Sequence, residues 1–153
     1  MFCVLSGHTS INLDAKGRLA IPTRYRTYLS ESCGGKFCAT VHPDVCLMLY
    51  PLHEWGPVQR KVMKLSNMNK KARDLQRLII GYASELDMDT NGRLLLPPSL
   101  REFAKLDKRV VLIGVGNKFE LWDEDRWNQR QNEWLADSGN QSSLSEELEQ
   151  LSL

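Results

Sequence analysis

The chain has 153 residues, of which 42% are hydrophobic and 25% charged, and its 20 Lys and Arg nearly balance its 19 Asp and Glu. This composition is that of an ordinary globular protein, and the length predicts one domain or two interlocked halves of one. No run of 18 apolar residues is present, which excludes a membrane-spanning helix. The four cysteines show no C-x-x-C spacing and no charged-then-apolar leader opens the chain, so we expect a cytosolic protein with reduced thiols.

The net charge of +1 conceals an uneven distribution. Residues 11–30 carry four cations against Asp14, and residues 57–81 carry seven against Asp74. Residues 144–153 contain three glutamates and no basic residue. The sequence therefore predicts two basic surfaces and an acidic tail.

The sequence of the first half of the chain predicts short strands before and after a helix. Ile11 and Leu13 alternate with polar residues, as in a half-buried strand, and Gly17 permits the reversal that follows. Pro22 favours the first turn of a short helix. The predicted strands are residues 10–14, 18–21, 37–41 and 46–50.

Apolar residues at helical intervals predict an amphipathic helix over residues 57–81, broken near residues 66–69. Its basic residues are interpreted as a solvated face opposite the apolar stripe, and an interaction surface is the alternative.

The second half follows the same plan. Its predicted strands are residues 83–88, 93–96, 109–115 and 119–122, with a short helix over residues 98–104. Asp123 is a good N-cap for a further helix, and a polar linker follows over residues 137–143. The tail then shows a thin apolar stripe that needs a partner surface or stays mobile, made of Leu144, Leu148 and Leu151.

The two halves share a repeated unit. A constant offset of 75 residues separates Asp14 from Asp89, Gly17 from Gly92, Arg18 from Arg93 and Arg26 from Arg101. Two copies of one small unit imply a pseudo-twofold domain with two equivalent turns.

Each repeated turn carries a candidate binding chemistry. Asp14 can accept backbone N–H groups of the turn or pair with Arg18, whose planar fork could approach a phosphate or a guanine edge. An ordinary hairpin with a local salt bridge is the alternative. Lys16 and Arg24 add charge to the first turn, whereas Asn91 replaces Lys16 in the second. We therefore expect the first turn to contribute more to binding.

Arg26 and Arg101 are interpreted differently from the turn arginines. Each lies on its short helix, and each is expected to pair with Asp14 or Asp89 as part of the scaffold.

Other candidate sites are weaker. A zinc site from Cys38, His42 and Cys46 matches no standard spacing, and we predict no metal and no cofactor. The chain shows no phosphate loop, paired carboxylates or nucleophile elbow, so no enzyme is predicted. Aromatic residues at apolar positions are interpreted as core or subunit contacts, namely Trp55, Trp122, Trp127 and Trp134.

Three segments together resemble the MraZ family of bacterial transcriptional regulators. They are Leu13-Asp14-x-x-Gly17-Arg18-Leu19 with Ile21-Pro22 and Tyr25-Arg26, Asp89-x-x-Gly92-Arg93-Leu94-Leu95, and Gly114-x-Gly116-Asn117-Lys118-Phe119-Glu120-Leu121-Trp122. One departure is the opening, since the family usually begins Met-Phe-Arg-Gly and Ser6 precedes Gly7 here. An N-terminal basic contact is therefore missing or shifted.

The resemblance implies an α+β fold in which two tandem swapped-hairpin units of the AbrB type form a pseudo-twofold small barrel with flanking helices. The expected boundaries are residues 8–55 for the first unit, 56–82 for a connecting helical segment, 83–127 for the second unit, and 128–153 for a C-terminal helix and acidic tail.

The resemblance also implies a ring-like homo-oligomer, cytoplasmic and nucleoid-associated, that regulates its own operon of cell-division and cell-wall genes. It would bind double-stranded DNA at short direct repeats in the promoter. By match to the family's motif, the residues carried over are Asp14, Arg18, Asp89 and Arg93. With the turn chemistry above, the full set of expected DNA-binding residues is Asp14, Lys16, Gly17, Arg18, Arg24, Asp89, Gly92 and Arg93.

The leading hypothesis is thus a sequence-specific DNA-binding repressor. The second is an oligomeric interaction module that acts through helix 57–81 and the acidic tail. A small β-barrel enzyme is a third, for which the fold alone carries no argument.

Overall fold

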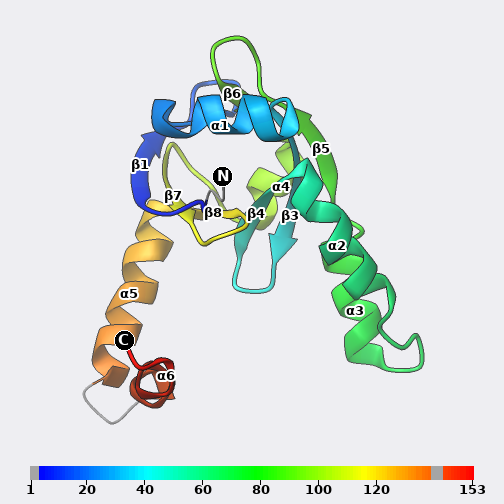
Figure 1. The fold of residues 1–153 in the computed structure, drawn as a ribbon, viewed down its shortest axis with the longest axis vertical. Coiled ribbons are helices and arrows are strands. Elements are labelled where there is room, and N and C mark those ends of the chain that lie inside the picture. The colour runs from blue at the N-terminus through cyan, green and yellow to red at the C-terminus, as the bar shows by residue number, and fades with distance from the viewer. Residues whose placement is uncertain (1–3, 139–142) are drawn as a thin grey trace. The chain divides into compact units, whose positions relative to one another are not determined.

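A computed structural model describes residues 4–138 and 143–153, and most of the predicted elements are present in it. The strands are β1 (His8–Asn12), β2 (Arg18–Ala20), β3 (Lys36–His42), β4 (Cys46–Pro51), β5 (Ser84–Asp87), β6 (Arg93–Leu95), β7 (Arg109–Gly114) and β8 (Phe119–Asp123). The helices are α1 (Thr23–Cys33), α2 (Leu52–Met63), α3 (Lys70–Ile79), α4 (Pro98–Phe103), α5 (Glu124–Ser138) and α6 (Ser143–Leu151). Residues up to Asp123 form one compact unit, and residues from Glu124 onward form a second (Figure 1).

Two antiparallel sheets organise the first unit. Six strands form an open sheet in the order β1-β7-β8-β4-β3-β5, and β2 pairs with β6 in a separate two-stranded sheet. The sheet order is palindromic under the sequence repeat, because β1 corresponds to β5, β7 to β3 and β8 to β4. The pseudo-twofold relation predicted from the repeat is therefore visible in the strand pairing.

The strand pairing crosses between the halves of the chain. β1 pairs with β7, β3 with β5, β4 with β8 and β2 with β6, each pair antiparallel. Among the described residues, the larger sheet keeps β1 and β5 as its two edges, so the small barrel that the family resemblance implied is not found as a closed barrel. The three-residue strands β2 and β6 pair with each other instead of bridging those edges.

The first strand starts earlier than its alternation predicted. β1 covers His8–Asn12, whereas the prediction was residues 10–14. Pairing with β7 ends at Asn12, which lies opposite Arg109, and Asp14 already belongs to the turn. The predicted helix break is confirmed, since α2 ends at Met63 and α3 begins after Asn69, whose side chain accepts from the Lys71 N–H at 2.9 Å.

The larger sheet buries apolar side chains on both faces. One face packs under the β2–β6 pair, α1 and α4, and includes Phe37, Leu49 and Phe119, all fully buried. On the other face Cys38 and Tyr50 pack with residues of α2 and α3. The Thr40 hydroxyl donates to the Ile79 carbonyl at 2.6 Å and fixes the end of α3 on β3. Trp55 and Trp122 are buried, as predicted.

The second unit consists of α5 and α6. α5 begins directly after Asp123 and runs to Ser138, two residues into the segment predicted as a linker, and α6 begins at Ser143, the last residue of that segment. Within α5 the rings of Trp127 and Trp134 pack edge to face, with centroids 5.5 Å apart. The rest of the predicted linker, residues 139–142, lies outside the described residues, as do residues 1–3 at the altered opening.

Candidate nucleic-acid interface

The first turn is a tight hairpin organised by Asp14. One carboxylate oxygen accepts the backbone N–H groups of Lys16 at 3.0 Å and of Arg18 at 2.8 Å. The other accepts the Arg18 Nε at 2.5 Å. Gly17, with φ +82°, donates its N–H to the Asp14 carbonyl at 3.0 Å. Asp14 therefore both accepts backbone N–H groups of the turn and pairs with Arg18, as predicted. The pairing fixes the guanidinium of Arg18 at its Nε.

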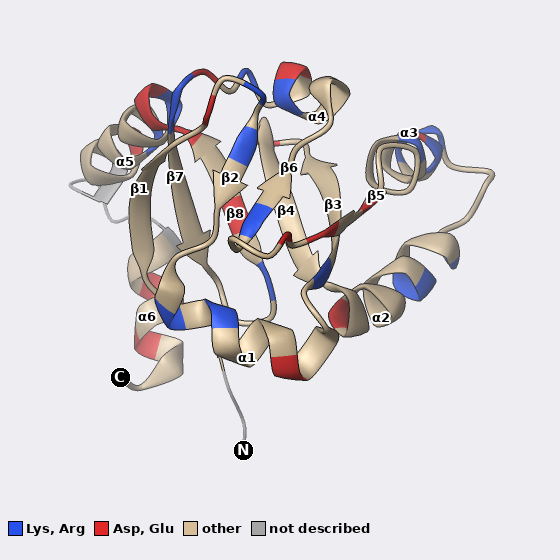
Figure 2. Ribbon diagram, turned by 90° about the horizontal axis from the view of Figure 1, so that it is seen from above, with Lys and Arg blue, Asp and Glu red and all other residues tan. Residues whose placement is uncertain are grey.

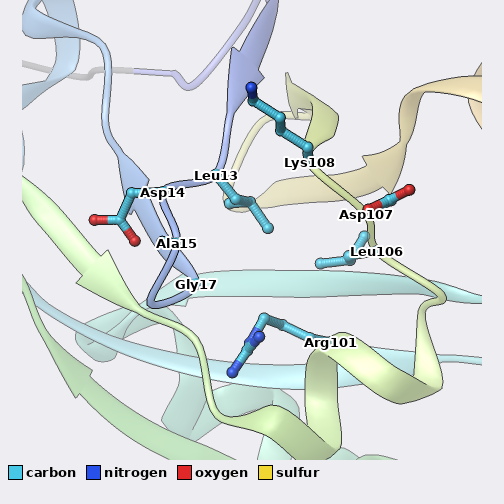
Figure 3. A pocket seen from close by; sticks show the side chains of 8 residues that line it. All are labelled: Leu13, Asp14, Ala15, Gly17, Arg101, Leu106, Asp107 and Lys108. Carbon is cyan, nitrogen blue, oxygen red and sulfur yellow. The ribbon is translucent and has the colours of Figure 1, made fainter.

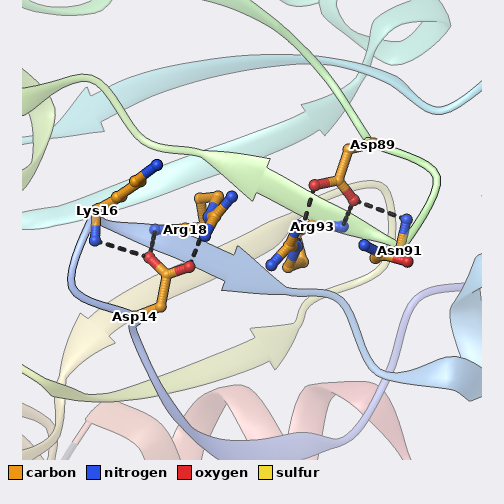
Figure 4. Close-up of polar contacts among 6 residues, drawn as sticks. All are labelled: Asp14, Lys16, Arg18, Asp89, Asn91 and Arg93. Carbon is orange, nitrogen blue, oxygen red and sulfur yellow. Dashed lines mark hydrogen bonds and ion pairs between the residues drawn. The ribbon is translucent and has the colours of Figure 1, made fainter.

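The second turn repeats this geometry. Asp89 accepts the N–H groups of Asn91 and Arg93 at 2.9 Å each, and the Arg93 Nε at 3.0 Å. Gly92 takes φ +75°. The two turns therefore present equivalent arginines in equivalent settings (Figure 4).

The β2–β6 pair, called the ribbon below, joins the two turns. Leu19 and Leu94 lie opposite each other and are fully buried, whereas Arg18 lies opposite Leu95 and Ala20 opposite Arg93. Because side chains alternate across a strand, the outward face of the ribbon carries two arginines in diagonal positions with Ala20 and Leu95. Figures 2 and 4 show the two short strands side by side, with the turns at opposite ends of the pair.

Arg26 and Arg101 do not pair with the aspartates as the sequence suggested. Arg26 Nε donates to the Ile21 carbonyl at 2.7 Å, and Arg101 Nε donates to the Leu96 carbonyl at 3.1 Å. Each guanidinium lies against the glycine of the opposite turn: Arg26 against Gly92, and Arg101 against Gly17. Each carboxylate already accepts three hydrogen bonds within its own turn, one of them from the arginine of that turn.

These contacts make Gly17 sterically as well as conformationally constrained. A Cβ at residue 17 would lie 2.6 Å from Arg101 Cζ, and the positive φ disfavours any side chain. We expect Gly17→Ala to lower the free energy of unfolding by about 1–3 kcal/mol. Chemical denaturation measures the loss. Gly34→Ala is the matched control, since Gly34 has φ +63° and no atom within 4 Å of its Cβ position. Equal losses for the two variants would contradict the role of Arg101.

The other expected site residues differ in position. Lys16 lies in the first turn, where Asn91 occupies the equivalent place in the second (Figure 4). Arg24 lies on α1, where it donates to the Thr9 hydroxyl at 2.7 Å and to the Tyr25 hydroxyl at 2.9 Å. Its recorded contacts are thus with β1 and α1 rather than with the turn.

The hydrogen bonds of the turns lower the pKa of both aspartates. The Arg18 backbone N–H, followed by its side chain and the Lys16 N–H, lowers the pKa of Asp14 to about 2 against burial, which acts to raise it. The pKa of Asp89 is lowered by the corresponding groups, led by the backbone N–H of Arg93. Both carboxylates are ionised at neutral pH.

The depressed pKa of Asp14 gives a pH prediction. Because the folded-state pKa lies below the ordinary 3.8, the turn stabilises the fold fully above that pH and loses this contribution as pH falls toward 2. We expect an NMR titration midpoint near 2 for the Asp14 carboxyl. Arg18→Ala should raise the midpoint only in part, because the backbone donors remain, and Lys16→Ala should leave it unchanged. A midpoint at 3.8 in the unmodified protein would contradict the turn geometry.

A cleft of about 490 Å³ lies beside the first turn. Figure 3 shows its lining residues, which are Leu13, Asp14, Ala15, Gly17, Arg101, Leu106, Asp107 and Lys108. Two carboxylates balance the two cations of this lining, so the cleft has no strong preference for an anion.

Comparison with known protein families also divides the chain into two similar segments, each with one turn. A family model described as "MraZ protein, putative antitoxin-like" matches twice, over residues 4–78 and 79–148. The chain belongs to the MraZ family. The resemblance inferred from the sequence motifs is thereby confirmed.

The curated MraZ relatives cover nearly the same length. The transcriptional regulator MraZ of Thioalkalivibrio sulfidiphilus is 50% identical over 147 residues, which are 96% of this chain and 98% of the relative. That of Halorhodospira halophila is 52% identical over 149 residues, again 96% and 98%. That of Methylococcus capsulatus is 54% identical over 132 residues, 86% of this chain and 87% of the relative. The MraZ family is thus one of transcriptional regulators, which confirms the prediction of a regulator rather than an enzyme.

Other candidate sites of this MraZ chain stay weak. In the part of the chain that the structure describes, no group of three or more His, Cys, Asp or Glu is placed to hold a metal. Cys38 and Cys46 are buried, and the His42 Nδ1 accepts the N–H of Asp44 at 3.0 Å. Burial raises the pKa of the Cys38 thiol to about 11. None of the described helices is long and apolar enough to span a membrane.

Sequence reasoning missed one residue of the outward face. Leu95 is 57% exposed and lies directly opposite Arg18 on the ribbon. The signal was available in the repeat, because the position equivalent to Leu95 in the first copy is Ala20. The outward face is therefore not identical about the pseudo-twofold axis.

Proposed function

We propose that this protein is a sequence-specific DNA-binding regulator that uses the ribbon to read short direct repeats in a promoter. The observation that carries the proposal is the placement of Arg18 and Arg93 together on the outward face, each held at Nε by its own aspartate. Among the described residues, the two arginines donate hydrogen bonds from their backbone N–H and Nε, and the terminal guanidinium nitrogens are available for a ligand.

A two-stranded ribbon has the dimensions to enter the major groove of B-DNA. There a preoriented guanidinium can donate two hydrogen bonds to guanine, the commonest specific contact. Lys16, in the exposed first turn, is suited to a neighbouring phosphate, whereas Asn91 lacks the charge for it. The first turn is therefore the stronger of the two in this proposal.

The unequal copies favour a non-palindromic site. A surface with true twofold symmetry suits palindromes, whereas here Lys16 corresponds to Asn91 and Ala20 to Leu95. Each subunit would then read one repeat in a fixed direction. Several subunits in a closed ring would engage several repeats at once and gain affinity through effective concentration.

The MraZ family assignment supports the remaining parts of the proposal. We infer that the protein acts in the cytoplasm at the nucleoid and represses its own division and cell-wall operon. The exchange of β1 and β2 with the second half supports a swapped-hairpin origin of the AbrB type, with the unit boundaries expected from the sequence.

The proposal is tested by footprinting and by affinity measurements on the DNA upstream of its own gene. We expect protection of direct repeats and a steep salt dependence, with about 0.9 added to the slope of log K against log salt for each phosphate neutralised. DNA fragments with one, two and three repeats should be bound with increasing affinity. Inserting half a helical turn, about 5 bp, between repeats should weaken binding.

The outcomes separate the hypotheses. Binding that is as tight to one repeat as to three would contradict the multivalent mechanism. Absence of salt-sensitive retention on any promoter fragment would favour the oligomeric interaction module.

A further inference from the structure

A second cleft, of about 510 Å³, lies between α2 and α3. Its walls are fixed by hydrogen bonds: Gln76 Nε2 donates to the Val62 and Leu65 carbonyls at 3.1 and 3.2 Å, and Arg73 Nη1 donates to the Asn67 carbonyl at 2.8 Å. The cleft is thus shaped by contacts within the chain itself.

Apolar surface is available at this cleft. Met63 lines it and is 64% exposed, and Met68, one residue after the lining Asn67, is 91% exposed. Ile80 closes the cleft on the α3 side. Exposed methionines adapt their shape to a partner and are common at binding surfaces.

The surroundings of the cleft are strongly basic. The cations of α2, α3 and the segment between them are Arg60, Lys61, Lys64, Lys70, Lys71, Arg73 and Arg77. Asp74 opposes them, and it is already paired with Lys70 at 2.9 Å and with Arg77 at 3.0 Å. Of these cations, Arg73 and Arg77 line the cleft itself and form its basic rim beside the apolar Met63 and Ile80. This combination fits an acidic amphipathic helix.

α6 has the complementary character. Its leucines at positions i, i+4 and i+7 share one side and are 55–66% exposed, namely Leu144, Leu148 and Leu151. The same helix carries three carboxylates, namely Glu146, Glu147 and Glu149. No basic residue follows residue 143. A helix of nine residues is marginal in water without a partner for its apolar side.

We propose that α6 of one copy docks its leucines into the α2–α3 cleft of a neighbouring copy, with its glutamates against the basic rim. This is the helix-in-groove mode of recognition. The contact joins different surfaces of the two copies, so it is head-to-tail and can close into a ring. It rests on the proposed assembly of copies and is independent of DNA recognition.

The apolar half of the contact is tested with single substitutions in the full chain. We expect Leu148→Asp, and separately Met63→Asp, to raise the dissociation constant between copies at least tenfold in analytical ultracentrifugation without DNA. Gln150→Asp adds the same charge to another side of α6 and should change the dissociation constant less than twofold. Circular dichroism checks that each variant is folded. Assembly unchanged by Leu148→Asp and Met63→Asp would overturn the inference and leave the ring proposal standing.

The charged half is tested by a mixing experiment. One variant carries Arg73→Glu with Arg77→Glu, and the other carries Glu146→Lys, Glu147→Lys and Glu149→Lys. Each alone should assemble at least tenfold more weakly than the unmodified chain. An equimolar mixture should recover assembly, because every cleft then meets a tail of opposite charge.

Mixing also separates docking between copies from docking within one chain. If the mixture stays dissociated while a single chain with all five substitutions recovers, α6 occupies its own cleft and the inference is wrong. An unmodified protein that is monomeric at micromolar concentration would overturn both the inference and the ring. The weakened variants should keep their affinity for a single repeat and lose the gain in affinity for three repeats, because that gain requires assembled copies.

Discussion

Replacing both ribbon arginines, in the variant Arg18→Ala with Arg93→Ala, is expected to abolish specific DNA binding while leaving the fold intact. Each bidentate contact of arginine with guanine contributes about 1–3 kcal/mol of discrimination, so the two together correspond to at least a 30-fold loss per subunit. Neither side chain is part of the core, since the buried side of the ribbon is formed by Leu19 and Leu94. Band shifts and circular dichroism measure the two properties.

The single variants should differ. Arg18→Ala should weaken binding more than Arg93→Ala, because Lys16 accompanies the first arginine and Asn91 the second. Arg60→Ala on α2 removes a cation outside the ribbon and should leave specificity unchanged. Equal losses for Arg18→Ala and Arg93→Ala would contradict the asymmetry, and full binding by the double variant would exclude the ribbon as the reading surface.

The largest loss of stability is expected from Leu94→Ala. This side chain is fully buried at the centre of the ribbon opposite Leu19, and removing it leaves a cavity beneath the interface. The expected cost is about 2–5 kcal/mol in the free energy of unfolding. Chemical denaturation monitored by tryptophan fluorescence measures it.

Leu95→Ala is the matched control for this prediction. It makes the same chemical change one residue later, on the outward face, where the side chain is 57% exposed. Its cost should stay within about 0.5 kcal/mol. A similar loss for both variants would mean that the ribbon has no distinct buried side.

Local patterns predicted most of the strands and helices correctly. The continuous apolar run of residues 110–113 indicated β7, and the Pro22 and Pro98 positions marked the starts of α1 and α4. These signals are local, so the sequence alone carries them. Strand partners depend on residues far apart, and the repeat indicated only that the two halves are equivalent.

In the candidate site, too, contacts between residues close in sequence were predicted and contacts between the two halves were not. The hydrogen bonds of Asp14 and Asp89 stay within five residues of the chain, and the turn residues alone predicted them. The packing of Arg26 on Gly92 and of Arg101 on Gly17 joins opposite halves, and it could not be deduced from either copy. Charge pairing alone predicted an aspartate as the partner of each of these two arginines, whereas Arg26 and Arg101 bond to backbone carbonyls and lie against glycines.

Translation gives the ribbon a further consequence. Its two strands are separated by 75 residues, so β2 leaves the ribosome roughly 4–15 seconds before β6 at a synthesis rate of about 5–20 residues per second. During that interval Leu19 has no Leu94 to pack against, and Gly17 of the first turn has no Arg101 against it. A chain whose translation stops in between has half of the reading surface. Under the proposed function, the promoter would therefore respond to the concentration of finished chains, and not to the number of chains that have been started.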